Sequence, residues 1–214
     1  MTLAEKVRPE HTALVVIDMQ NDFCHPEGAW GKLGMPLEAT HRMIPRLESL
    51  LQHARGVGVQ VVFVGTHYLP EVLTPVWTER REHRRRVPML RPGTWGAQFI
   101  LPPQPQDIVL YKHRYSAFLG TPLDLVLRGR GIQTVVLAGT VTNVCVETTA
   151  RDACQREYYV VVVEDCCSAL SEEDHQAALR NVDRYFGEVV SSDVLRRAWS
   201  AVATVGSSVA YPGG

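Results

Sequence analysis

Short, almost continuous runs of apolar residues alternate with amphipathic stretches along most of this 214-residue chain. Six such runs are rich in valine, isoleucine and leucine, and they cover residues 13–18, 59–65, 107–112, 134–139, 158–165 and 188–191. Runs without strict alternation of apolar and polar residues are typical of strands that are covered on both faces. They predict six strands of a parallel sheet.

Five stretches that follow these runs have the apolar spacing of helices: residues 38–55, 121–130, 143–156, 171–186 and 192–205. The first of them places Met43, Leu47 and Leu50 on one side of a helix. Strands that alternate with helices in this way indicate crossover connections. The predicted fold is therefore a three-layer α/β/α, doubly wound, mainly parallel six-stranded sheet in a single domain over residues 1–214, with a flexible tail at 206–214.

One connection, residues 66–106, is much longer than the others and contains seven prolines. Loops of this length inside a domain are usually functional, so we expect a lid or an interface segment. It includes the densest charge of the chain, residues 79–86, with five arginines. We interpret this run as a solvated helix face or a subunit contact, because 22 Lys and Arg balance 23 Asp and Glu and a nucleic-acid surface needs a basic excess.

Several classes of protein are disfavoured by what the sequence lacks. No apolar run approaches the ~18–20 residues that cross a bilayer, and the first residues have no apolar signal core, so we expect a cytoplasmic protein without a membrane partner. Five cysteines without C-x-x-C spacing argue against a disulfide framework or structural zinc. We interpret Cys166 and Cys167 as small buried hydrophobes rather than a redox switch, and Cys24 as a pocket wall.

Three reactive side chains stand at strand ends where a parallel sheet binds its ligands. Asp18 ends the first predicted strand, Lys112 ends the third, and Cys145 follows the fourth at the start of a helix. A helix start and a nearby ammonium both favour a thiolate over a thiol, so we expect an anionic sulfur at Cys145. Asp18 would then carry the proton.

The histidines are weaker candidates for the site, and several well-known functional motifs are missing. Alternation along the third strand should turn His113 to the other face of the sheet from Lys112, and His25 and His67 are weaker candidates for the rim of the pocket. No G-x-G-x-x-G follows a strand, and the patterns G-x-x-x-x-G-K-[ST], H-E-x-x-H and G-x-S-x-G are absent. Nucleotide binding and serine hydrolysis are therefore not supported.

Three segments, LVVIDMQNDF, DIVLYKHRYSAF and VVLAGTVTNVCVETTARDA, resemble the isochorismatase-like cysteine hydrolase superfamily, and the resemblance extends from about residue 12 to residue 192. It implies a catalytic triad of Asp18, Lys112 and Cys145. It also implies a cis peptide bond between Thr140 and Val141, with an oxyanion hole formed by the amides of Val141 and Cys145.

Two departures from the family's patterns narrow the range of reactions and cofactors that we expect. Isochorismatases proper carry a non-nucleophilic residue where Cys145 stands, so the thiol favours covalent cleavage of a C–N bond. The Asp-x-His metal pair of nicotinamidases is missing, because Val57, Gly58 and Val59 lead into the second strand. We therefore expect no metal and no other cofactor. The PGTWG segment around Trp95 is similar to the carbamoyl- and ureido-hydrolase side of the superfamily.

The sequence thus predicts a metal-free cysteine amidohydrolase that cleaves a C–N bond of a small amide or ureide through a thioester. The candidate substrate-binding residues are Phe23, Trp95, Tyr115 and Asn143. Two alternatives stay open: a nicotinamidase-type amidase, and a catalytically silent redox sensor that uses Cys145 and Cys154. The resemblance also implies a homodimer or homotetramer.

Overall fold

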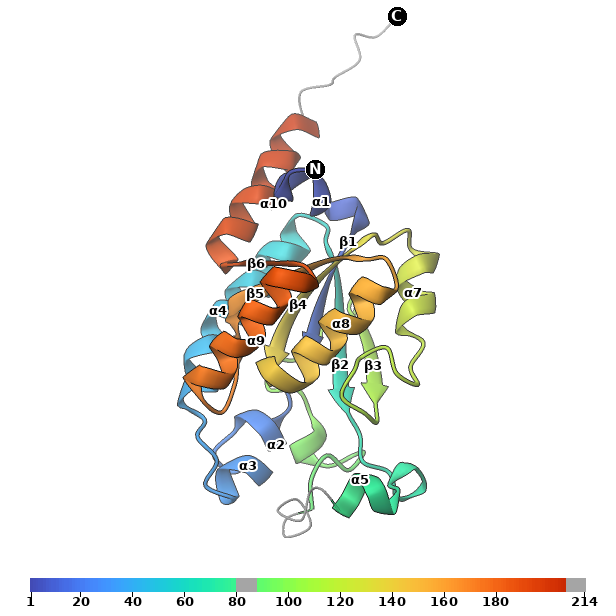
Figure 1. The fold of residues 1–214 in the computed structure, drawn as a ribbon, viewed down its shortest axis with the longest axis vertical. Helices are drawn as coiled ribbons and strands as arrows, with labels where there is room; N and C mark the ends of the chain where they lie inside the picture. The colour runs from blue at the N-terminus through green and yellow to red at the C-terminus, as the bar shows by residue number, and fades with distance from the viewer. Residues whose placement is uncertain (80–87, 207–214) are drawn as a thin grey trace, which may run out of the picture.

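The fold is built on one six-stranded sheet in which all neighbouring strands are parallel (Figure 1). The computed structural model describes residues 1–79 and 88–206, with side chains up to residue 201. The strands are β1 (Thr12–Ile17), β2 (Gln60–Thr66), β3 (Ile108–Lys112), β4 (Thr134–Thr140), β5 (Tyr159–Ser168) and β6 (Glu188–Val190). Their order is β3-β2-β1-β4-β5-β6. Each predicted strand is confirmed, with ends shifted by a few residues.

The longer helices cover both faces of this sheet, which confirms the three layers (Figure 1). α4 (Glu38–Gly56) and α10 (Ser192–Gly206) lie on one face, and α7 (Leu123–Gly129), α8 (Glu147–Gln155) and α9 (Glu172–Tyr185) on the other. Shorter helices are α1 (Leu3–Lys6), α2 (Asn21–Cys24), α3 (Ala29–Lys32) and α5 (Pro75–Glu79). Within the described parts of the chain, no helix combines the length and apolar character that crossing a bilayer requires.

The continuous apolar character of the strands comes from a core on each face of the sheet. Along β1, Leu14 and Val16 pack into the core beneath α4 and α10. Val15 and Ile17 point the other way, into the core beneath α7, α8 and α9. Because both faces exclude water, polar residues have no favourable position along such a strand.

A glycine lets β1 and β4 approach closely where the site forms. Gly139 has φ +119°, and a Cβ atom at this position would lie 2.1 Å from the carbonyl oxygen of Ile17. No other residue fits this conformation and this spacing. The end of β1, which leads into Asp18, therefore lies beside the end of β4.

The long connection after β2 lies at the end of the sheet toward which the strands point, together with α2 and α3 (Figure 1). It contains α5 and two short 3₁₀ turns, Pro70–Val72 and Trp95–Ala97. The buried carboxylate of Asp22 holds the connection in place, because this carboxylate accepts hydrogen bonds from the amides of Ala29 (3.1 Å) and Leu90 (2.6 Å). Residues 80–86 of the arginine-rich run and 207–214 of the predicted tail lie outside the described residues.

Candidate active site

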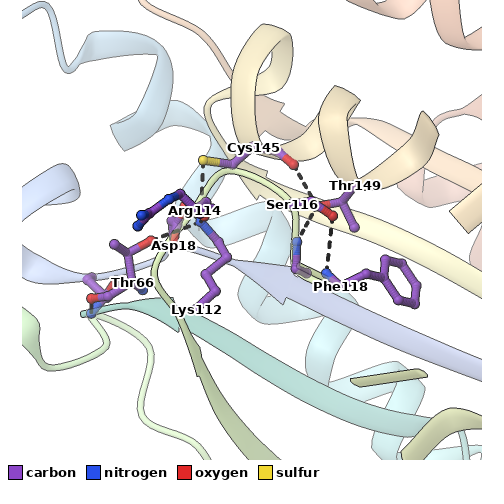
Figure 2. Close-up of polar contacts among 10 residues, drawn as sticks. Asp18, Thr66, Lys112, Arg114, Ser116, Phe118, Cys145 and Thr149 are labelled. Atoms are coloured by element: carbon purple, nitrogen blue, oxygen red, sulfur yellow. Dashed lines mark hydrogen bonds and ion pairs between the residues drawn. The ribbon is translucent and has the colours of Figure 1, made fainter. Parts of the chain in front are cut away.

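The carboxyl ends of β1, β3 and β4 bring Asp18, Lys112 and Cys145 together (Figure 2). The ammonium of Lys112 lies 2.8 Å from Oδ2 of Asp18 and 3.4 Å from Sγ of Cys145. Asp18 and Lys112 are each 1% exposed and Cys145 is 8% exposed. All three line one cavity of about 120 Å³. A nucleophile and a carboxylate thus each lie within hydrogen-bonding distance of one cation in the wall of a small cavity.

Thr66, the last residue of β2, completes this cluster. Its hydroxyl donates to Oδ1 of Asp18 (2.7 Å) and accepts from the ammonium of Lys112 (2.8 Å). The sheet register explains the contact, because Thr66 pairs directly with Lys112 between β2 and β3. Sequence reasoning missed this residue because the second predicted strand ended at residue 65. The rule that pointed to Asp18 and Lys112 would have pointed here as well.

Replacing Thr66 with valine should lower kcat by at least about tenfold, because the carboxylate would lose the donor that fixes its orientation. The same change should lower the free energy of unfolding by about 1–3 kcal/mol, since charged groups would lose a buried partner. Steady-state kinetics and denaturant unfolding measure both effects. Thr66→Ser, which keeps the hydroxyl, is the matched control, and a valine variant as active as the serine variant would contradict this role.

Cys145 lies on a turn that is braced against the chain beyond β3. It belongs to a π-helical turn, Thr142–Val146, that leads into α8, so the helix predicted at 143–156 begins with a wider turn. The hydroxyl of Thr149 donates to the carbonyl oxygen of Cys145 (2.7 Å) and accepts from the amide of Ala117 (3.0 Å). The peptide bond between Thr140 and Val141, just before the turn, is cis.

The protonation state of Cys145 differs from the expectation. Burial raises the pKa of its thiol to about 12, the negative charge of Asp18 adds to the shift, and the ammonium of Lys112 only partly opposes it. Burial works against the charged form of Lys112 too, but the attraction of Asp18 and Cys145 outweighs it and leaves the pKa of Lys112 raised. The expected anionic sulfur is therefore wrong for the resting site, which holds a neutral thiol beside an ion pair.

Alkylation of Cys145 by iodoacetamide should consequently be slow at neutral pH. Its rate should rise about tenfold per unit between about pH 7 and pH 10, because only the thiolate reacts. The measurement is the mass of the labelled Cys145 peptide, in a Cys154→Ser background that removes the half-buried thiol of α8. A rate already constant above about pH 7 would show that the thiolate is the resting form.

Three of the four predicted substrate-binding residues line the catalytic cavity, namely Phe23, Tyr115 and Asn143. Trp95 is not among the residues that line it. The residue is 46% exposed, and its ring packs edge-on against that of His25, with the ring centroids 5.0 Å apart. The 3₁₀ turn Trp95–Ala97 thus braces the long connection outside this chamber.

Further walls come from residues that the sequence analysis did not single out. Trp30, Tyr68, Trp77, Arg114 and Asp174 all line the cavity. The guanidinium of Arg114 donates to the carbonyl oxygens of His113 (2.8 Å) and Val72 (3.0 Å) and lies 4.6 Å from the ring centre of Trp77. The long connection therefore contributes aromatic walls, and Arg114 ties it to the chain that follows β3.

The remaining candidates lie away from this chamber. Cys24, expected as a pocket wall, is fully buried and does not line the cavity, while Cys166 and Cys167 pack in the two cores as predicted. His113 bonds to the carbonyl oxygen of His67 (2.8 Å), whose ring stacks on Tyr111. Among residues 1–79 and 88–206, no three or more His, Cys, Asp or Glu side chains are grouped to hold a metal ion.

Comparison with known proteins agrees with this arrangement. The model of the isochorismatase domain matches residues 12–194. The ureidoacrylate amidohydrolase RutB of Methylobacterium radiotolerans is 37% identical over 202 residues, covering 87% of this chain and 78% of the relative.

Two solved structures extend the likeness to the fold. A cysteine hydrolase from Pseudomonas syringae pv. phaseolicola has a TM-score of 0.83 at 31% identity, covering 92% of this chain and 96% of its own. The N-carbamoylsarcosine amidase of Thermoplasma acidophilum has a TM-score of 0.69 at 33% identity, covering 85% and 96%. On its sequence, its sheet and the three side chains gathered at Cys145, this chain belongs to the isochorismatase family.

Proposed function

We propose that this protein is a cysteine amidohydrolase that needs no metal and cleaves a C–N bond of a small ureide or linear amide through a thioester. The observation that carries the proposal is the contact of Lys112 with both Asp18 (2.8 Å) and Cys145 (3.4 Å) in the wall of the cavity. A thiol that only packs in a core does not require a buried ion pair beside it, and burying such a pair costs desolvation free energy.

In the first half of the reaction, Sγ of Cys145 attacks the substrate carbonyl carbon. The thiol is neutral at rest, so its proton passes to the carboxylate of Asp18 as the C–S bond forms. Lys112 stays protonated throughout and stabilises the negative charge that moves between the sulfur and the carboxylate.

Negative charge also develops on the carbonyl oxygen of the substrate. Val141 and Cys145 both line the cavity, and in this proposal their amides donate hydrogen bonds to that oxygen. One such donor is worth about 3 kcal/mol in comparable acyl-transfer sites. Collapse of the tetrahedral intermediate breaks the C–N bond, and the leaving ammonia or amine takes the proton from Asp18.

The second half returns the enzyme to its starting state. A water molecule attacks the thioester while Asp18 accepts its proton. The C–S bond breaks, the sulfur regains a proton from Asp18, and the acid product leaves. Over the cycle one water is consumed and one amine or ammonia is released, and Asp18 finishes ionised beside Lys112.

The size and lining of the cavity favour a small, flat substrate. About 120 Å³ is well below the ~300–1,000 Å³ of pockets that hold drug-sized ligands. Aromatic walls on several sides suit a planar group, and the urea group is planar. The names of the relatives, a ureidoacrylate amidohydrolase and an N-carbamoylsarcosine amidase, point to ureides as the first compounds to try.

The test is ammonia release from a panel that holds ureidoacrylate, N-carbamoylsarcosine, biuret, nicotinamide and simple aliphatic amides. We expect turnover of at least one ureide. Intact-mass analysis during turnover should show an adduct on the wild-type protein that is missing from Cys145→Ala. An adduct that persists in the alanine variant would move the nucleophile to another residue and overturn the proposal.

Chelation separates this proposal from a nicotinamidase that depends on a metal. Turnover of the best ureide should be unchanged after dialysis against EDTA, because no step of the proposed cycle uses a metal ion. The measurement is kcat before dialysis, after it, and after zinc or iron is added back. Loss of turnover that zinc or iron restores would contradict the metal-free cycle.

The redox-sensor alternative is less favoured by the geometry. Sensor thiols are exposed and have a lowered pKa, whereas Cys145 is buried and its pKa is raised to about 12.

We further propose that the protein acts in the cytoplasm as a homodimer or homotetramer, with the long connection serving as a lid or subunit contact. Light scattering of the purified protein gives the number of subunits directly.

A further inference from the structure

Two side chains that line a second cavity reach the residues next to Val141. This cavity has a volume of about 380 Å³, and its walls include Ser168 and His175. Leu170 lines both this cavity and the catalytic one. Ser168 and His175 are absent from the lining of the catalytic cavity, so any effect of theirs on the turn is exerted from outside it.

Side-chain hydrogen bonds hold the residues on either side of Val141. Thr142, which follows it, has its hydroxyl 2.8 Å from Nδ1 of His175 in α9. On the other side, the hydroxyl of Ser168 at the end of β5 lies 3.3 Å from that of Thr140. Ser168 is held in turn by the hydroxyl of Thr40 in α4, at 3.0 Å.

These bonds connect rigid elements to the turn. Thr40, Thr140, Thr142 and Ser168 are each 2–3% exposed, so water competes little for their hydroxyls. The start of α9 is fixed by Ser171, whose hydroxyl accepts a hydrogen bond from the amide of Asp174 (3.1 Å). A helix and a strand thus each bond to a residue next to Val141.

We propose that His175 and Ser168 are positioning residues that hold the Val141 amide where it meets the substrate oxygen. Neither residue lines the catalytic cavity, so each acts through its neighbouring threonine. This inference rests on the proposed function, which assigns the Val141 amide to the oxyanion. Displacing a preorganised donor by about 1 Å can cost about 100-fold in rate.

The experiment compares two reactions of the same sulfur. Hydrolysis of the best ureide of the panel places negative charge on a carbonyl oxygen, whereas alkylation by iodoacetamide displaces iodide from a methylene carbon and develops no oxyanion. Both rates are measured at one pH for the wild type, His175→Ala, His175→Asn and Ser168→Ala. Gln176→Ala is the matched control, because this side chain lies next to His175 and bonds only to Glu172 among the described residues.

We expect His175→Ala to lower kcat by about tenfold or more, with little change in KM and an alkylation rate close to that of the wild type. His175→Asn should recover much of the loss, because its amide places a polar atom near the position of Nδ1. Ser168→Ala should show the same separation of the two reactions, which keeps the proposal testable if a His175 variant does not fold.

Two other outcomes would overturn the inference. Normal hydrolysis in both alanine variants would show that the turn needs neither contact. A parallel loss of hydrolysis and alkylation would show damage to the whole site rather than to the oxyanion donor. A wild type that turns over nothing in the panel would be a different failure, since the proposed function would fall and this inference with it.

Discussion

Cys145→Ser should lower kcat for the best ureide by about 10⁴-fold or more, because the proposed cycle has no other nucleophile. Serine keeps the size of the side chain, so the fold and the Asp18–Lys112 pair should be preserved. Its hydroxyl is a far weaker acid than a thiol, and the carboxylate of Asp18 cannot ionise it efficiently. Stopped-time ammonia assays measure the loss, and thermal unfolding should show a transition close to that of the wild type.

Cys154→Ser is the control for this change. Cys154 is a half-buried thiol of α8 that does not line the catalytic cavity, so its replacement should leave kcat unchanged. If the two serine variants were equally active, the chemistry would not pass through Cys145. If both were inactive, loss of a thiol in this region would be damaging for structural reasons.

Lys112→Met should lower the free energy of unfolding by about 3–5 kcal/mol at neutral pH, because it leaves the carboxylate of Asp18 buried without a cation. Turnover should be lost as well, since the proton acceptor loses its electrostatic partner. Denaturant unfolding at neutral pH measures the deficit.

Two comparisons make this second prediction specific. Lys6→Met breaks an ion pair with Glu188 that is partly exposed, and such pairs are worth only about 0–1 kcal/mol. The double variant Asp18→Asn/Lys112→Met should recover part of the stability lost in the single variant, because no buried charge then remains unpaired. A double variant no more stable than Lys112→Met would show that the loss comes from packing rather than charge.

The sheet and the meeting of Asp18, Lys112 and Cys145 could be predicted because their signals are local. The central strands bury both faces, so their apolar runs stand out in the sequence, although β3 leaves Val109 and Tyr111 exposed. The three side chains follow from the rule that ligands bind beyond strand ends. The helix predicted at 121–130 could also be recognised, from Pro122 in its first turn and Gly131 after its end. Such features depend on a few neighbouring residues and on the direction of the strand.

The walls of the cavity could be predicted only in part. Phe23, Tyr115 and Asn143 line it as expected, but the other walls depend on how distant segments meet. Trp95 carries a strong motif but lies outside the chamber, whereas Trp30 and Trp77 line it without any motif. The prediction of an anionic sulfur at Cys145 was wrong for a related reason. A helix start and a lysine can be recognised in the sequence, but the depth of burial that raises the pKa is a property of the assembled fold.

The cation of the site is carried by one of the two edge strands of the sheet. Among the described residues β3 pairs with β2 alone, whereas Asp18 and Cys145 follow strands in the middle of the sheet. The edge strands of a sheet open more readily than its central strands in native-state fluctuations. A brief detachment of β3 would carry the ammonium of Lys112 away from the carboxylate and the sulfur while the remaining strands stayed paired, so local opening at this border would interrupt turnover without unfolding the sheet.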